Sequence, residues 1–125
     1  MKLDDTLIAQ RETVVRTYCA AWGESDPEAR QQLLRSCFEE SGSYTDPNWH
    51  QPSLMDLQNL VGDVLRRLPT ARIVQRSKHQ TYRDVGKFEW ELVFEDGAVH
   101  LRGTDFVTFS PAGKLQSVVG FFADA

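Results

Sequence analysis

The order of the sequence patterns predicts an α+β fold, with three helices followed by a run of antiparallel strands. Apolar residues recur at helical spacing up to Leu68, and after Pro69 the period changes to two. Each helix has only one apolar stripe to bury, so the helices must cover one face of a curved sheet. A strongly bent sheet around a long helix forms a cone, and a cone can hold a pocket.

The three predicted helices have recognisable starts and stops. The first spans Asp4–Trp22 and is ended by Gly23. The second opens at Asp26-Pro27-Glu28, where a capping carboxylate precedes proline at the first helical position, and it runs to about Phe38. The third opens with a sequence similar to a capping box and spans Ser53–Leu68.

The second half of the chain is predicted to consist of strands. Phe88–Glu95 alternates apolar and acidic residues, and the Asp96-Gly97 turn leads into a returning strand over Val99–Phe109. A second turn at Pro111–Lys114 precedes the strand Leu115–Phe122. Two further strands are predicted from weaker patterns, a short one through Tyr44 and one over Ile73–Tyr82.

Composition and charge limit the possible partners. The chain has 125 residues, of which 41% are hydrophobic and 26% charged, as is typical of a single soluble domain spanning residues 1–125. The net charge of −4 and the absence of a basic cluster argue against a nucleic-acid or anionic-membrane partner. No apolar run could span a membrane, and the aspartates in MKLDDTLIAQ are unlike a signal peptide. We therefore expect a cytoplasmic protein.

Cysteine and histidine usage predicts neither a disulfide nor a metal site. Cys19 and Cys37 share no close spacing and lie in segments with a helical pattern, so we interpret them as reduced packing residues. The three histidines are scattered and do not form the clustered ligand set that a metal needs.

Three residues could carry chemistry, namely Tyr18 on the first helix, Asp46 in a turn and Asp105 on a strand. Each also has an ordinary structural explanation. Tyr18 lies on an apolar helical face, where core aromatics are common. Asp46 precedes Pro47, and such residues usually accept local backbone N–H bonds. Asp105 could point to solvent. Taken singly, the structural explanation is favoured for all three.

Strand parity favours an inward position for Asp105. In the segment LRGTDFVTF, Asp105 shares its parity with Leu101, Gly103, Val107 and Phe109, whereas the opposite set is more polar. A carboxyl group on the apolar face must find hydrogen-bond donors or stay protonated, because ionisation is unfavourable in a low-dielectric site. A protonated Asp105 could donate a hydrogen bond at physiological pH.

Three segments resemble the ketosteroid isomerases. Val14–Trp22 is similar to their first helix, which carries the oxyanion-hole tyrosine. Tyr44–Pro47 resembles the segment with their catalytic-base aspartate, and Thr104–Lys114 the strand and turn with their second, protonated aspartate. The matching positions are, in chain order, Tyr18, Asp46 and Asp105. The resemblance covers most of the chain and implies the cone-shaped nuclear transport factor 2-like fold, to which SnoaL-like polyketide cyclases also belong.

The resemblance implies a small-molecule enzyme that needs no cofactor. Asp46 would remove a proton next to a carbonyl group, while Tyr18 and a protonated Asp105 would stabilise the enolate oxygen. Return of the proton to another carbon gives an isomerase, and carbon–carbon bond closure gives a cyclase. We expect a small apolar carbonyl ligand and a homodimer. The predicted substrate-binding residues are Trp22, Trp49, His50, Val64, His79, Trp90, Val107, Val118 and Phe122.

Other functions of this fold require different residues. An epoxide hydrolase would need an Arg-x-Asp pair and an acid on the last strand, but Leu115–Phe122 has no acid and Arg102 is opposite in parity to Asp105. A dehydratase would need pocket histidines, for which His50 and His79 are candidates. The main alternative is a non-catalytic ligand-binding or dimerisation module, which has no need of one ionised and one protonated aspartate.

Overall fold

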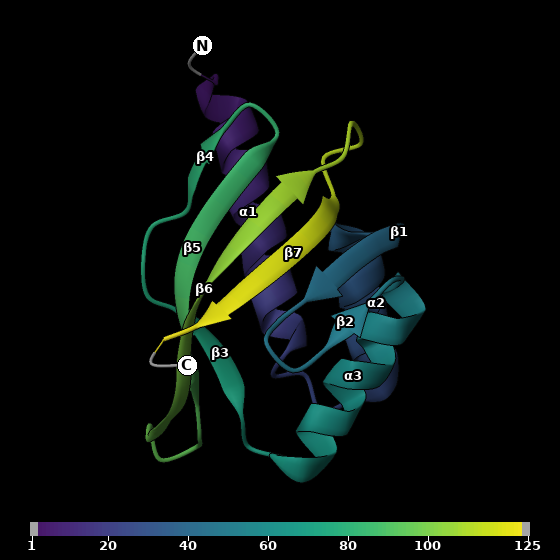
Figure 1. Ribbon diagram of the computed structural model, residues 1–125, viewed down its shortest axis with the longest axis vertical. Helices are drawn as coiled ribbons and strands as arrows, with labels where there is room; N and C mark the ends of the chain where they lie inside the picture. The colour runs from purple at the N-terminus through teal and green to yellow at the C-terminus, as the bar shows by residue number, and fades with distance from the viewer. Residues whose placement is uncertain (1–2, 124–125) are drawn as a thin grey trace.

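The computed structural model describes residues 3–123, which form three helices and seven strands (Figure 1). The helices are α1 (Asp5–Ala21), α2 (Pro27–Cys37) and α3 (Leu54–Arg67). The strands are β1 (Phe38–Thr45), β2 (His50–Gln51), β3 (Arg72–Gln75), β4 (Gln80–Tyr82), β5 (Val85–Val93), β6 (Val99–Phe109) and β7 (Leu115–Phe122). The predicted α+β fold, with three helices packed on a curved sheet, is confirmed.

The helix starts are those that the sequence predicts. The side chains of Asp4, Asp26 and Ser53 each accept a hydrogen bond from a backbone N–H of the following first turn. Pro27 occupies the first helical position of α2, where its missing N–H is not needed. Local capping chemistry thus fixes where each helix begins.

The sheet is mixed, which corrects the expectation of a purely antiparallel one. Its strand order is β2-β1-β7-β6-β5-β3, with β4 beside β5. β1 and β7 run parallel, whereas the other neighbouring pairs are antiparallel. The chain passes through α3 and five strands between β1 and β7, and a parallel pair requires such a long connection. Alternation within one strand does not reveal the direction of its partner.

Two strand boundaries also differ from the prediction. The segment Ile73–Tyr82 forms two short strands, β3 and β4, which pair with different parts of β5. In the break between them, the Ser77 hydroxyl accepts a hydrogen bond from the Glu89 N–H at 2.7 Å, which explains the poor alternation. β1 begins at Phe38 and continues through Gly42, where a Cβ would lie 2.5 Å from the Phe38 ring.

The helices cover the inner, concave face of the sheet and leave the outer face exposed. In Figure 1, α1 crosses behind the sheet, and α2 and α3 lie beside β1. The core between them includes Val15, Leu34, Leu57, Phe88 and Leu115, all of which are fully buried. The outer face carries the exposed apolar side chains of Phe106, Val119 and Phe121. Within residues 3–123, no helix combines the length and the apolar character needed to cross a membrane.

Candidate active site

Side chains from α1, from the turn after β1 and from β6 meet at one cavity. The cavity has a volume of about 290 Å³, and Tyr18, Asp46 and Asp105 all line it. Its walls come from α3 on one side and from β5 and β6 on the other. The three residues singled out in the sequence, which lie far apart along the chain, are therefore neighbours in space.

Strand register explains how the two aspartates come together. Thr45, the last residue of β1, pairs with Val119 of β7, and the next residue of β7, Gly120, pairs with Asp105 of β6. A Cβ at Gly120 would lie 2.9 Å from Asp105 Oδ1 and 3.7 Å from Asp46 Cβ. Glycine at this position leaves the space in which both carboxyl groups face the cavity.

Asp105 is a buried carboxyl group with an altered acidity. Its side chain is 5% exposed, and Oδ1 accepts a hydrogen bond from Trp90 Nε1 at 2.8 Å. Burial raises the pKa of Asp105 to about 7; the Trp90 hydrogen bond opposes this rise, and the nearby charge of Asp46 adds to it. Because the indole N–H can only donate, Oδ1 is the acceptor oxygen and Oδ2 is left to carry the proton. Near pH 7, Asp105 can therefore donate a hydrogen bond.

Tyr18 supplies a second neutral donor. Its side chain is 2% exposed, its ring stacks on Phe38 at 6.2 Å, and its hydroxyl has no hydrogen-bond partner within residues 3–123. Burial raises the pKa of Tyr18 well above its ordinary value, and Asp105 raises it further. Trp22 lowers this pKa slightly, although its indole does not meet hydrogen-bond geometry with the hydroxyl. A buried hydroxyl without a protein partner is uncommon, and this one can donate a hydrogen bond to a group in the cavity.

Asp46 lies in a half-buried turn and is held by local donors. Its Oδ1 accepts from the backbone N–H groups of Asn48 and Trp49, each at 2.8 Å, and its Oδ2 accepts from the Tyr44 hydroxyl at 2.7 Å. A carboxylate can accept about four hydrogen bonds, so these three leave one position open toward the cavity. The turn thus fixes the orientation of Asp46 without saturating it.

Five of the predicted substrate-binding residues line the cavity. Trp90 and Phe122 meet edge to face, with 6.1 Å between ring centroids, and Trp22 packs on Tyr44 at 5.7 Å. Trp49 lies at the mouth with about half of its surface exposed. The five residues are Trp22, Trp49, Val64, Trp90 and Phe122.

The two histidines predicted to bind substrate lie away from the cavity. His50 is exposed on β2, where its Nδ1 is 2.8 Å from the Thr45 hydroxyl. His79 is buried beside Phe109, and a Cβ at Gly86 would lie 2.6 Å from its Nε2. His79 follows the break between β3 and β4, and an irregular segment cannot be assigned to a face by parity. The arrangement offers no support for a dehydratase that uses these histidines.

Val107 and Val118 also stay outside the cavity lining, because they fill the core next to it. Both point inward as strand parity predicts, but they pair with each other across β6 and β7 and are almost fully buried. Parity identifies the inner face of a strand, but it cannot separate residues that border the cavity from residues packed beneath it.

Four polar cavity residues were not predicted, and two of them have a usable sequence signal. Tyr44 precedes Asp46 by two positions, which is the spacing of side chains on one face of a strand. Arg67 follows Val64 by three positions, so helical spacing places it beside a predicted pocket residue. Asn48 and His100 are in an irregular turn and at the start of β6, where no pattern identifies them.

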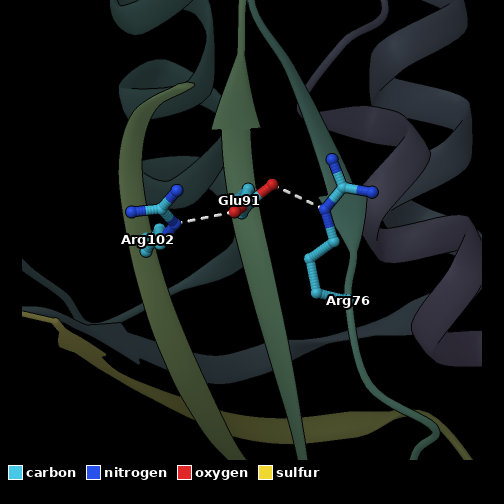
Figure 2. Close-up of polar contacts among 3 residues, drawn as sticks. All are labelled: Arg76, Glu91 and Arg102. Atoms are coloured by element: carbon cyan, nitrogen blue, oxygen red, sulfur yellow. Dashed lines mark hydrogen bonds and ion pairs between the residues drawn. The ribbon is translucent and has the colours of Figure 1, made fainter. Parts of the chain in front are cut away.

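The outer face of the same sheet carries a different arrangement of charge. Glu91 on β5 accepts hydrogen bonds from Arg76 Nε at 2.5 Å and from Arg102 Nε at 2.7 Å (Figure 2). The two arginine side chains lower the pKa of Glu91.

Among the described residues, no group of three His, Cys, Asp or Glu side chains could hold a metal ion.

Solved structures with the same fold are numerous. No protein-family profile and no curated protein sequence matches this chain. The structure is similar to that of a candidate isomerase of the SnoaL-like family from Agrobacterium tumefaciens, with a TM-score of 0.85 and 29% identity over 92% of this chain and 98% of the other.

Two more distant structures share the fold. One is a candidate SnoaL-like polyketide cyclase from Jannaschia sp. CCS1, with a TM-score of 0.75 and 13% identity over 98% of this chain and 91% of the other. The other is a nuclear transport factor 2-like protein of unknown function from Exiguobacterium sp. 255-15, with a TM-score of 0.72 and 18% identity over 90% of this chain and 99% of the other. The chain therefore has the nuclear transport factor 2-like fold, and SnoaL-like proteins are among its structural neighbours.

Proposed function

We propose that this protein is a cofactor-free enzyme that removes a proton next to the carbonyl group of a small, mostly apolar substrate. The observation that carries the proposal is the arrangement of three groups around one cavity. Asp46 is a carboxylate with an open acceptor position, and Asp105 and Tyr18 are buried donors. The likeness to a candidate SnoaL-like isomerase supports the same reaction class.

The proposed reaction divides the work between the three side chains. The proton on the carbon next to the carbonyl moves to Asp46, and the electrons of the C–H bond move into the carbonyl to form an enolate. The negative charge on the enolate oxygen is stabilised by hydrogen bonds from the Tyr18 hydroxyl and from protonated Asp105. Buried, preoriented donors stabilise such a charge strongly because water does not compete for them.

The fate of the proton determines the product. If Asp46 returns it to a different carbon of a conjugated enolate, the double bond moves and the reaction is an isomerisation. If the enolate carbon attacks a second carbonyl in the same molecule, a ring closes, Asp46 gives its proton to the new alkoxide oxygen, and the reaction is a cyclisation. Atoms and charge balance in both cases without a cofactor, since Asp46 ends each cycle ionised.

The test is deuterium incorporation from heavy water into a panel of ketones, measured by mass spectrometry. General-base catalysis typically contributes 10²- to 10⁴-fold, so we expect Asp46→Asn to lower the exchange rate by roughly that factor. Asparagine can still accept the two backbone hydrogen bonds, so circular dichroism should show an intact fold. Exchange by the variant at the wild-type rate would refute the role of Asp46.

Asp96→Asn is the matched control. Asp96 also accepts a backbone hydrogen bond in a turn, from the Ala98 N–H at 2.9 Å, but it lies outside the cavity lining. We expect this substitution to leave the exchange rate unchanged. An equal loss in both variants would indicate a general effect of altering turn aspartates.

A non-catalytic ligand-binding module is the second candidate. It is favoured by one observation, namely that three local donors already hold the Asp46 carboxylate as they would in a purely structural turn. For such a module, the wild-type protein and Asp46→Asn should show the same exchange rate for every ketone, while ligands still bind in the cavity.

A further inference from the structure

The cavity changes in polarity from its floor to its mouth. Tyr18 and Asp105, both almost fully buried, lie at the floor. Aliphatic side chains, among them Leu60, Val64 and Leu92, line part of the wall. The exposed residues of the lining are Asn48, Trp49, Arg67 and His100, which form the mouth. A ligand that fills this cavity meets donors at one end, aliphatic side chains along the wall and cationic or polar groups at the other end.

The mouth carries one formal positive charge, that of Arg67, although the chain as a whole is acidic. The lining contains two carboxyl groups, Asp46 and Asp105, and both lie deeper than Arg67 and His100. Asp63, at the adjoining hollow next to the mouth, is already paired with Arg66. The guanidinium group of Arg67 forms no hydrogen bond or ion pair with any residue between 3 and 123. This group is available to a ligand.

We propose that the substrate is an oxo acid, with its carbonyl group at the cavity floor and its carboxylate bound by Arg67 at the mouth. The planar guanidinium group matches a carboxylate with two parallel N–H donors. His100 and Asn48 also line the cavity and can supply further hydrogen bonds. The inference rests on the proposed function for the carbonyl end, and on the charge of the mouth for the other end.

The position of Asp46 determines which end of the substrate enters first. A carboxylate placed at the floor would lie close to Asp46 and would be repelled, whereas a neutral carbonyl is not. The aliphatic part of the wall suits an aromatic ring or a short alkyl chain. Charge therefore selects one orientation of a ligand that would otherwise fit in two.

The test measures binding rather than turnover, so that it does not depend on the proposed reaction. The probes are 3-(4-hydroxyphenyl)propanoate and its methyl ester, whose phenol groups imitate an enol at the floor. Binding to the wild-type protein is followed by tryptophan fluorescence, since Trp22, Trp49 and Trp90 line the cavity. An exposed ion pair contributes up to about 1 kcal/mol, so we expect the acid to bind roughly fivefold tighter than the ester.

Two neighbouring arginines provide the matched protein comparison. Introducing Arg67→Gln should remove the preference for the acid and leave ester binding unchanged. Introducing Arg66→Gln removes the same charge from the next residue, which points to Asp63 and does not line the cavity, and it should preserve the preference. Raising the salt concentration should weaken the preference for the acid in the protein that retains Arg67, and it should have no effect on binding to Arg67→Gln.

Several results would overturn the inference. Equal binding of acid and ester would do so, as would tighter binding of the ester. Equal effects of Arg66→Gln and Arg67→Gln would show that only the general field of the protein matters. Absence of deuterium exchange with every ketone would refute the proposed reaction, but it would leave the measured preference for the acid intact. The two failures are therefore distinguishable.

Discussion

Two carboxyl groups on neighbouring strands show how differently the two faces of one sheet treat charge. Asp105 on β6 faces the cavity, accepts one hydrogen bond from an uncharged indole, and has a pKa raised to about 7 by burial. Glu91 on β5 faces outward, accepts hydrogen bonds from two arginines, and has a lowered pKa (Figure 2). The inner face keeps a carboxyl group protonated near neutral pH, and the outer face keeps one ionised.

The difference shows which contacts serve structure and which serve a site. Each carboxylate oxygen of Glu91 accepts a hydrogen bond from an arginine, as expected for a surface charge. Asp105 has lost hydration and has gained only one donor, which is an unfavourable state for a carboxylate. Groups with such unfavourable environments concentrate at functional sites. Substitutions on each face of the sheet can test this contrast.

Replacing Asp105 with asparagine should stabilise the protein at neutral pH and impair it as an enzyme. In the wild type, stability should fall as pH rises from about 4 to about 7, because the unfolded chain ionises Asp105 more readily than the folded one. The difference between the pKa of Asp105 in the folded and in the unfolded chain corresponds to roughly 4 kcal/mol of unfolding free energy. This is the largest stabilisation that Asp105→Asn should give above pH 7. Loss of one oxyanion donor should lower the exchange rate roughly 10²- to 10³-fold.

Urea denaturation of both proteins between pH 4 and pH 8 measures the first effect. The difference in unfolding free energy should grow with pH across this range and level off above about pH 7. A difference that does not vary with pH would mean that Asp105 is ionised in the folded protein, contrary to the role proposed for it.

Replacing Trp90 with phenylalanine should move the pH dependence of activity. The indole hydrogen bond lowers the pKa of Asp105, so its removal should raise that pKa further. Asp105 donates only when protonated, and the loss of kcat/KM at high pH should therefore shift upward by about one to two pH units. Trp22→Phe, which enlarges the same cavity without removing a hydrogen bond to Asp105, should leave this limb of the profile in place.

Replacing Glu91 with glutamine should have the smallest effect. It removes an exposed charge between two arginines, so we expect a small loss of stability at neutral pH and no change in exchange rate. Because the pKa of Glu91 is lowered in the folded state, its contribution is present above the ordinary pKa and disappears as pH falls through the lowered one. Salt at about 1 M should suppress the difference. A loss as large as the gain from Asp105→Asn would contradict the contrast between the two faces.

Much of the fold follows from local signals in the sequence. The limits of β6 and β7 are those predicted, because clear turn residues flank both strands, and alternation within β6 is regular from Leu101 onward. The inward position of Asp105 follows from the same alternation. The parallel pairing of β1 and β7 could not be predicted, because it depends on how distant segments pack. Yet this pairing brings Asp46 beside Asp105, so only the resemblance to a known family connected the two.

The candidate site could be predicted in its floor but not in its mouth. Tyr18 and Asp105 occur in periodic segments and Asp46 in an Asp-Pro turn, whereas Asn48 lies in an irregular turn and His100 belongs by parity to the more polar set of β6. His79 was misplaced because it follows a break in its strand. The homodimer and the cytoplasmic location stay predictions. The exposed apolar surface of the sheet includes Phe106, Val119 and Phe121. Sedimentation of the wild type and of a variant with a charge introduced on this surface would test the homodimer.

The parallel pair of β1 and β7 also sets the time at which the site can exist in a growing polypeptide. The helices and β1 emerge from the ribosome early, but β1 has no partner on its β7 side until the last strand is made. At roughly 5–20 residues per second, the Tyr18 and Asp46 segments wait several seconds for β7. Until then, the edge of β1 and the apolar wall of the future cavity are uncovered, so this is the interval of synthesis in which binding by a chaperone would protect the chain most.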